Sequence, residues 1–358
     1  MLQKFFATAI GVAAFSGIFA QDTKDSTEAS PFKFSGSADV YYRFNFNDPP
    51  KTVQPLYNNF TSFTPSQSSF ELGMVSLKGE HTFGKALMVA DVGFGRRVED
   101  FSYNDNPQKN GFVSLANIKQ LYLSYAISDK FKLTMGKWAT HVGYELVDAY
   151  LNRNYSMSYM FSYGPFFHTG LKADIGLGSK SALMIGIANP TDYSTTTSSS
   201  KFVIGQFSTA SGNDKLKAYL NYQGGKVSPG VSLNQFDVVL TGAVSDKFSI
   251  GYNGTVQSRK PASETGNSWW GNALYFNLDP ATNYGFTLRT EYFHDEKAVA
   301  GVGTNVFETT LSGNFKISRL TIIPELRLDN ASAAVFTKGN GSKTKNTSTA
   351  LLAAVYSF

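Results

Sequence analysis

Few residues of this chain have the types and spacing that catalysis or metal binding would need. None of the four histidines, His81, His141, His168 and His294, stands at a metal-ligand spacing from another histidine or a carboxylate cluster. Cysteine is absent, which excludes disulfides, thiolate metal sites and a cysteine nucleophile. There is no Gly-x-Ser-x-Gly motif. We therefore expect no cofactor, no metal and no enzymatic activity. For His168 we expect a hydrogen bond within the protein.

The composition points away from an ordinary soluble domain. Only 16% of the 358 residues are charged and 15% are aromatic, whereas soluble domains carry about 25% charged residues. The formal net charge of +5 is spread along the chain, without a basic run that would indicate nucleic-acid binding. After the N-terminus no apolar run is long enough for a spanning helix. Apolar residues that alternate with polar ones produce such a profile in membrane β-barrels.

Strict alternation is visible from Phe32 to Phe46, where aromatic and small apolar residues occupy one parity and polar residues the other. Period-two alternation predicts a strand with one apolar face and one wet face. In a membrane barrel the apolar face meets lipid and the wet face lines the lumen. The charged residues predicted to line the lumen are Lys33, Asp39, Arg43, Asp91, Arg97, Lys172, Asp174, Arg289, Glu291, Glu325 and Arg327. Pro324 lies within one of these strands and predicts a local irregularity.

The connections between the predicted strands alternate between short and long. Tight turns are expected at 84–85, 128–130 and 245–247, and long polar loops at 47–68, 190–200, 223–231, 258–268 and 330–346. Outer-membrane barrels have such asymmetry, with short periplasmic turns and long extracellular loops. We predict an all-β, transmembrane antiparallel β-barrel of about 16 strands, with 14 or 18 as alternatives. A barrel of that size has room for an aqueous channel.

The two ends of the chain fit this architecture. Residues 1–20 have the three-part form of a secretory signal peptide, with an uncleaved anchor helix as the alternative, and residues 21–31 form a flexible mature N-terminus. The barrel is expected to occupy 32–358. Its last strand, 347–358, carries Tyr356 and Phe358 on one parity, and this ending is similar to the signal that the barrel assembly machinery reads. An edge strand of a soluble β domain is the alternative for this strand.

One connection, 139–165, is too long for a plain hairpin and has apolar residues of its own. We expect it to fold into the lumen and narrow it, with Glu145, Asp148 and Arg153 as constriction residues. The two acids would then face a basic wall, for which Arg43, Arg96, Arg97 and Arg289 are the candidates. The alternatives are a loop packed on the outer rim and a barrel–barrel contact.

Several segments carry a family resemblance: FKFSGSADVYYRFNF, SFELGMVSLKGEHTFGK, ADVGFGRR, the stretch from IKQLYLSYAISDKFKL to YGPFFHTG, and the terminal VYSF. Together they resemble the OmpL-like β-barrel porin family of Gram-negative outer membranes, most strongly from Phe32 to Gly170. The resemblance implies an outer-membrane pore and no particular solute. The expected partners are outer-membrane lipid and lipopolysaccharide, the barrel assembly machinery, small hydrophilic solutes and a homotrimer, but no nucleic acid.

The expected function is passive diffusion of small hydrophilic solutes and ions. A barrel with a closed lumen, whose extracellular loops bind a partner or a surface, is the first alternative. A barrel enzyme that hydrolyses lipid is the second, although no motif supports it.

Overall fold

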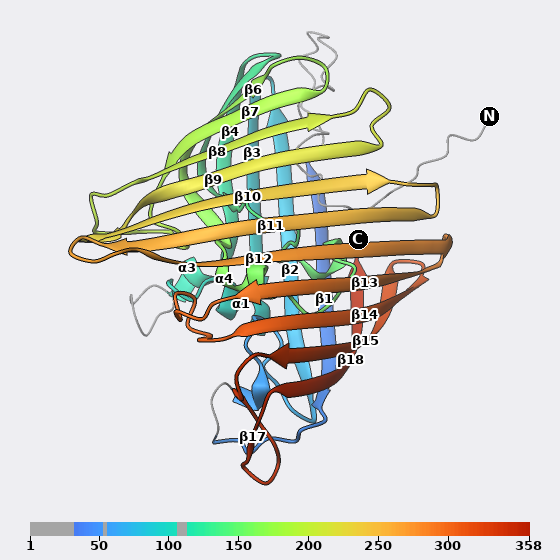
Figure 1. The fold of residues 1–358 in the computed structure, drawn as a ribbon. Coiled ribbons are helices and arrows are strands. Elements are labelled where there is room, and N and C mark those ends of the chain that lie inside the picture. Colours follow the sequence, from blue (N-terminus) through green and yellow to red (C-terminus); the bar gives the residue numbers. More distant parts are fainter. Residues whose placement is uncertain (1–31, 53–55, 106–112) are drawn as a thin grey trace.

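The chain folds into one closed antiparallel β-barrel, shown in Figure 1. The structure is a computed structural model, and it describes residues 32–52, 56–105 and 113–358. Sixteen strands form the barrel, which closes where β1 (Lys33–Asn45) pairs with β18 (Asn346–Ser357). The predicted fold class and strand number are confirmed. The predicted signal peptide and flexible N-terminus lie outside the described residues.

Each remaining strand is hydrogen-bonded to its neighbours in chain order, and β15 pairs with β18. Their bounds are β2 (Ser69–Phe83), β3 (Ala86–Phe94), β4 (Ile118–Ser128), β5 (Phe131–Ala139), β6 (Phe167–Gly176), β7 (Ser181–Ala188), β8 (Phe202–Ala210), β9 (Leu216–Ser228), β10 (Val231–Ala243), β11 (Phe248–Pro261), β12 (Asn267–Ala281), β13 (Tyr284–His294), β14 (Asn305–Ile317) and β15 (Leu320–Ala331). A tilted strand crosses a bilayer in about 9–11 residues. The 13 to 15 residues of β9–β12 therefore extend past the hydrocarbon.

This extension corrects two predicted loops. The long loop expected at 223–231 is strand as far as Ser228, and only a tight turn at Gly230 (φ 80°) separates β9 from β10. Likewise β11 and β12 occupy most of 258–268. Polar residues in these stretches still alternate between the inner and outer face, as in the rest of each strand. Gln223, for example, points inward, and its Nε2 donates to Gln235 Oε1 on the neighbouring strand at 2.8 Å. Long and short connections therefore do not alternate without exception.

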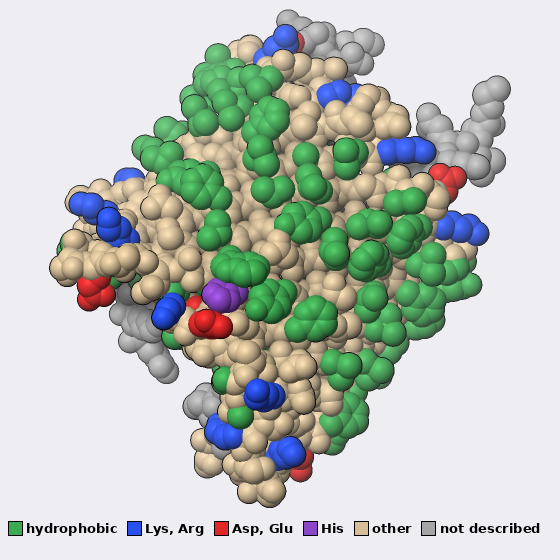
Figure 2. Space-filling model, viewed as in Figure 1, with side chains coloured by type: hydrophobic (Ala, Val, Ile, Leu, Met, Phe, Trp, Pro, Cys, Tyr) green, Lys and Arg blue, Asp and Glu red, His purple; other side chains and the backbone are tan. Residues whose placement is uncertain are grey.

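The two faces of the barrel differ as the alternation predicted. Figure 2 shows hydrophobic side chains spread over one side of the outer face of the strands. Among the most exposed hydrophobic residues of the barrel are Phe70, Leu72 and Met135. The inward parity is mostly polar and buried. None of the helices in the described ranges is long and apolar enough to cross a membrane.

Short elements occupy the longer connections. They are η1 (Leu56–Asn58), α1 (Arg96–Phe101), α3 (Val113–Asn117), η2 (Ala149–Leu151), α4 (Tyr159–Tyr163), and the hairpin of β16 (Phe336–Thr337) and β17 (Lys343–Thr344). The irregularity predicted at Pro324 is confirmed, because the ladder between β14 and β15 skips from the pair Ser312–Glu325 to the pair Phe315–Ile322. Proline has no N–H to donate to that ladder.

Candidate functional site: an infolded loop and the inner wall

The connection between β5 and β6, residues 140–166, runs through the inside of the barrel. Its backbone donates to inward-facing side chains on distant strands: Gly143 N–H to Asp237 on β10 at 3.0 Å, and Tyr155 N–H to Glu325 on β15 at 2.8 Å. A loop packed on the outer rim could not reach these atoms.

Wall carboxylates hold the backbone of this loop. Glu291 on β13 accepts from the N–H groups of Tyr159 (2.7 Å) and Met160 (2.8 Å). These N–H groups belong to the first turn of α4 and have no partner within that helix. The Ser158 side chain caps the same turn by accepting from Phe161 N–H at 3.1 Å. The wall thus stabilises a helix that is too short to be stable alone.

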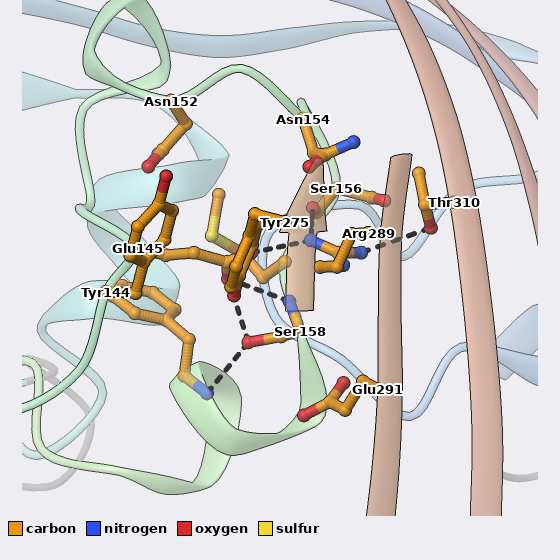
Figure 3. Close-up of polar contacts among 12 residues, drawn as sticks. Tyr144, Glu145, Asn152, Asn154, Ser156, Ser158, Tyr275, Arg289, Glu291 and Thr310 are labelled. Atoms are coloured by element: carbon orange, nitrogen blue, oxygen red, sulfur yellow. Dashed lines mark hydrogen bonds and ion pairs between the residues drawn. The ribbon is translucent and has the colours of Figure 1, made fainter. Parts of the chain in front are cut away.

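Glu145 and Arg289 form the centre of the contact between loop and wall. In Figure 3 the Arg289 guanidinium points from β13 toward the loop. Its Nη1 donates to Glu145 Oε1 at 2.6 Å and to the Ser156 carbonyl at 2.7 Å, and its Nε donates to Glu308 at 3.0 Å. Glu145 also accepts from Ser158 N–H at 2.8 Å. Arg289 is fully buried, and these ion pairs and hydrogen bonds offset the cost of removing its charge from water.

Asp148 and Arg153, the other two predicted constriction residues, are also paired. Asp148 lies 2.5 Å from Lys119 Nζ; burial raises the pKa of Asp148, and the Lys119 charge opposes this shift. Arg153 makes a bidentate contact with Asp279, at 2.8 and 3.0 Å, near the tight turn between β12 and β13. The sequence did not predict Lys119 as an inward residue. The pairing of β3 with β4 has a register irregularity at this point, so the alternation of inward and outward residues along β4 is interrupted there.

The expected basic wall is only partly present. Of the four candidates, Arg289 bonds to Glu145, while Arg97 donates to the Val147 carbonyl at 3.2 Å. Arg43 instead donates to the Ser66 carbonyl in the first long loop, and Arg96 is exposed.

The other predicted lumen charges on this side are buried as well. Tyr155 donates its hydroxyl to Asp39 at 2.5 Å, and Arg327 donates to the Met157 carbonyl at 2.7 Å. Asp91 accepts from Ser76 at 2.9 Å. Whether these residues line a conducting path stays a prediction.

A second group of inward charges, on β5 and β6, remains in contact with water. Lys132 and Lys172 share one carboxylate, Asp174, at 3.4 and 3.5 Å. The side chains of the three residues are 33%, 21% and 14% exposed, in that order. On β2 the pair of Lys78 and Glu80 is similarly exposed. The predicted Lys33 is exposed at the tight-turn end, opposite Glu80.

Two histidines meet at the start of the loop. The rings of His141 and His168 lie 4.9 Å apart, and His168 Nε2 shares a hydrogen bond with Thr140 Oγ1 at 3.2 Å, as expected for His168. Burial lowers the pKa of His141 to about 4. Within the described residues, no group of three or more histidine and carboxylate side chains could hold a metal ion.

The terminal aromatics lie on the outer face at the closing seam. Phe358 exchanges backbone hydrogen bonds with Gly36, at 2.9 and 3.1 Å, and its ring lies 6.0 Å from Phe34 and 6.2 Å from Tyr356. Their role as an assembly signal stays a prediction.

Solved structures of outer-membrane channels share this fold. The anion-selective porin from Comamonas acidovorans matches with a TM-score of 0.61 at 10% identity, covering 92% of this chain and 100% of that one. The outer membrane channel DcaP of Acinetobacter baumannii matches with a TM-score of 0.60 at 11% identity, covering 94% of this chain and 99% of that one. The trimer form of OmpT from Vibrio cholerae matches with a TM-score of 0.58 at 12% identity, covering 92% of this chain and 100% of that one. At these identities the likeness shows the fold alone. No curated protein matches the sequence.

The sequence itself matches a family across the whole barrel. The family described as "Putative beta-barrel porin-2, OmpL-like" matches residues 31–358, which includes the infolded loop and the wall that binds it. The family and the fold together indicate an outer-membrane barrel of the porin type, and a channel rather than an enzyme. The chain belongs to this OmpL-like family of β-barrel porins.

Proposed function

We propose that this protein is a narrow porin, through which small hydrophilic solutes and ions diffuse passively along the part of the lumen that the loop leaves wet. The observation that carries the proposal is the exposure of Lys132, Lys172 and Asp174. These side chains point inward by strand parity, so their exposed surface supports an entry of water into the barrel on this side.

Further partly exposed groups indicate how the wet side continues along the wall. Tyr122 on β4 and Gln206 on β8 have the inward parity and are partly exposed, and Gln206 donates to the His141 carbonyl at 3.2 Å. Tyr150, on the loop, is 41% exposed. A path lined by phenols, an amide and paired charges suits small polar solutes, because it offers them hydrogen bonds in place of bulk water.

The occupied side of the lumen supports a second candidate, a closed barrel whose outer loops bind a partner. Inward side chains along β9–β15 are almost all buried, including Gln223, Gln235 and Gln257 near the long-loop end. A barrel filled in this way over its whole section would conduct no solute.

The remaining expectations belong to the same proposal. We propose that the chain reaches the outer membrane by secretion and barrel assembly, that it contacts lipopolysaccharide, and that it forms a homotrimer. The fold it shares with the OmpT trimer form supports the last point. Chemical cross-linking of the folded protein in native membranes would test it, and a monomer only would contradict it.

Single-channel conductance in a planar bilayer decides between the two candidates. The intact chain is compared with a variant in which residues 141–165 are replaced by a short Gly-Ser turn. Ala139 and Phe167 are directly paired, so a tight turn can join the two strands. We expect small, stable steps from the intact chain and much larger steps from the variant.

Folding of both proteins is verified by retention of β-structure and by heat-modifiable gel mobility. Silence from a folded intact chain, together with conductance from the variant, would contradict the diffusion porin and support the closed barrel.

A further inference from the structure

Three lysines form a row on the outer face of the barrel, at the long-loop end of β8–β11. Lys226 on β9 and Lys260 on β11 both pair with Ser232 of β10, and Lys201 immediately precedes β8. All three are exposed. Figure 2 shows basic side chains gathered at this end of the strands.

No carboxylate in the part of the chain that the structure describes forms an ion pair with this row. Within the described ranges none of the three lysines forms an ion pair, and Lys201 Nζ reaches only the carbonyls of Ser198 and Ser200, at 3.3 and 3.4 Å. Extending the pairing of Val203 with Gly224 by two residues places Lys201 opposite Lys226. Like charges directly opposite each other on neighbouring strands are destabilising. An anion between the two ammonium groups would remove that repulsion.

A shallow groove of about 530 Å³ is lined by two of these lysines, Lys201 and Lys226, and by Val203 and Tyr222. Its lining also includes Gly224, where a Cβ would collide with the Tyr222 hydroxyl, and the Val203 side chain in it is 57% exposed. Tyr222 lies over this glycine and donates its hydroxyl to Asn234 on β10 at 2.8 Å. The groove is therefore built from a defined arrangement of side chains, with an apolar wall below a cationic mouth.

The depth of the groove matches the boundary between lipid headgroups and acyl chains. Four residue pairs below the lysine row, Tyr222 pairs with Phe236, and their rings lie 4.9 Å apart. Further around the barrel at the same level, Val256 pairs with Trp270. Aromatic belts mark the interface of a membrane, and lysines just outside them attract anionic headgroups.

We propose that this groove binds a phosphate-bearing lipid of the outer leaflet, with the phosphate between Lys201 and Lys226 and an acyl chain along Val203 and Tyr222. The uncompensated positive charge above an apolar groove is what selects an anionic lipid over a zwitterionic one. The proposal rests on the membrane location of the barrel and is independent of whether the lumen conducts.

The test uses the full mature chain, refolded into phosphatidylcholine vesicles that contain either diphosphorylated lipid A or the same lipid without its phosphates. Bound lipid is counted by native mass spectrometry after extraction. We expect the wild type to retain the phosphorylated lipid, and Lys201→Gln/Lys226→Gln to bind it about 30-fold more weakly, since each lysine near an anionic surface contributes about fivefold. Lys215→Gln/Lys247→Gln, in exposed turns at the opposite end, is the matched control and should bind like the wild type.

Three outcomes would overturn the proposal. Equal retention of the phosphorylated and dephosphorylated lipids would remove the role of the phosphate. Full competition by inorganic phosphate alone would make this a site for free anions rather than for lipid. A change in oligomeric state of the lysine variant, without loss of lipid, would identify the groove as a contact between copies of the chain.

Discussion

Arg289 on β13 and Lys132 on β5 both point into the barrel, but they are bound very differently. Arg289 is fully buried and bonds to Glu145, Glu308 and the Ser156 carbonyl. Lys132 is one-third exposed and shares its single carboxylate at 3.4 Å. The first arrangement fixes the loop to the wall, because a buried cation is destabilising unless ion pairs and hydrogen bonds satisfy it. The second leaves donors that are accessible to water.

The comparison teaches that inward parity alone does not identify a pore-lining charge. The carboxylate oxygens of Glu291 and Glu325 accept hydrogen bonds from backbone N–H groups of the loop, so these residues hold the loop in place. On β6, Lys172 and Asp174 have the same parity and remain partly exposed. The loop, which covers one side and not the other, makes the difference.

The largest effect is expected for Arg289→Ala. It leaves Glu145 buried without its cation and Glu308 with Arg327 alone, at 4.0 Å, which should lower the free energy of unfolding by about 3–5 kcal/mol. Urea unfolding of the refolded protein in lipid vesicles measures it. Lys132→Ala is the matched control and should cost less than about 1 kcal/mol, because its ion pair is exposed. Equal losses in both variants would erase the distinction between the two sides.

Next is the charge reversal Lys132→Glu/Lys172→Glu. If solutes pass along β5 and β6, the ratio of anion to cation permeability should fall, on the order of threefold for each unit of charge changed. The reversal potential under a salt gradient measures this ratio. The same reversal at Lys215 and Lys247, in turns outside the lumen, serves as control. An unchanged reversal potential would mean that ions do not pass these lysines.

A smaller effect is expected for Glu145→Ala/Asp148→Ala. This double change uncovers the cations of Arg289 and Lys119 and should shift selectivity toward anions, by at most about threefold for each charge. If selectivity stays the same in a folded barrel, Glu145 and Asp148 are not constriction residues. Heat-modifiable mobility of the variant establishes that the barrel is intact.

The smallest expected effect is a pH dependence of hydrogen exchange at Phe166 and Phe167, where the infolded loop ends and β6 begins. Asp192 accepts from the N–H groups of Phe166 (2.7 Å) and Phe167 (3.1 Å), and burial raises its pKa to about 7. Its folded pKa exceeds the unfolded value near 4, so the folded form is favoured at low pH, and this advantage is lost as pH rises from about 4 to 7.

Hydrogen exchange at these two amides, corrected for intrinsic rates, should therefore be less protected at pH 8 than at pH 5.5, on the order of tenfold. Asp192→Asn should remove most of that dependence. A pH dependence that persists in the variant would assign it to another group.

Much of the architecture follows from local patterns. Alternation along Phe32–Phe46 requires one apolar and one wet face, and the aromatic ending at Phe358 belongs to a strand that closes the barrel. The length and apolar content of 139–165 also indicated a structured loop. Two loop boundaries failed because polar residues such as Gln223 look like loop residues, yet Gln223 donates to the inward amide of Gln235 across the sheet.

What the sequence by itself determined is the alternation of faces, and hence an antiparallel membrane barrel with polar residues inside. Period two is a property of each strand and needs no partner to be read. Only the tertiary structure decided which inward charges are buried and which meet water. Glu145 lies 144 positions from Arg289, and Asp148 meets Lys119 only because a register shift turns that lysine inward. Such contacts depend on the path of the loop through the lumen, which many distant strands determine together.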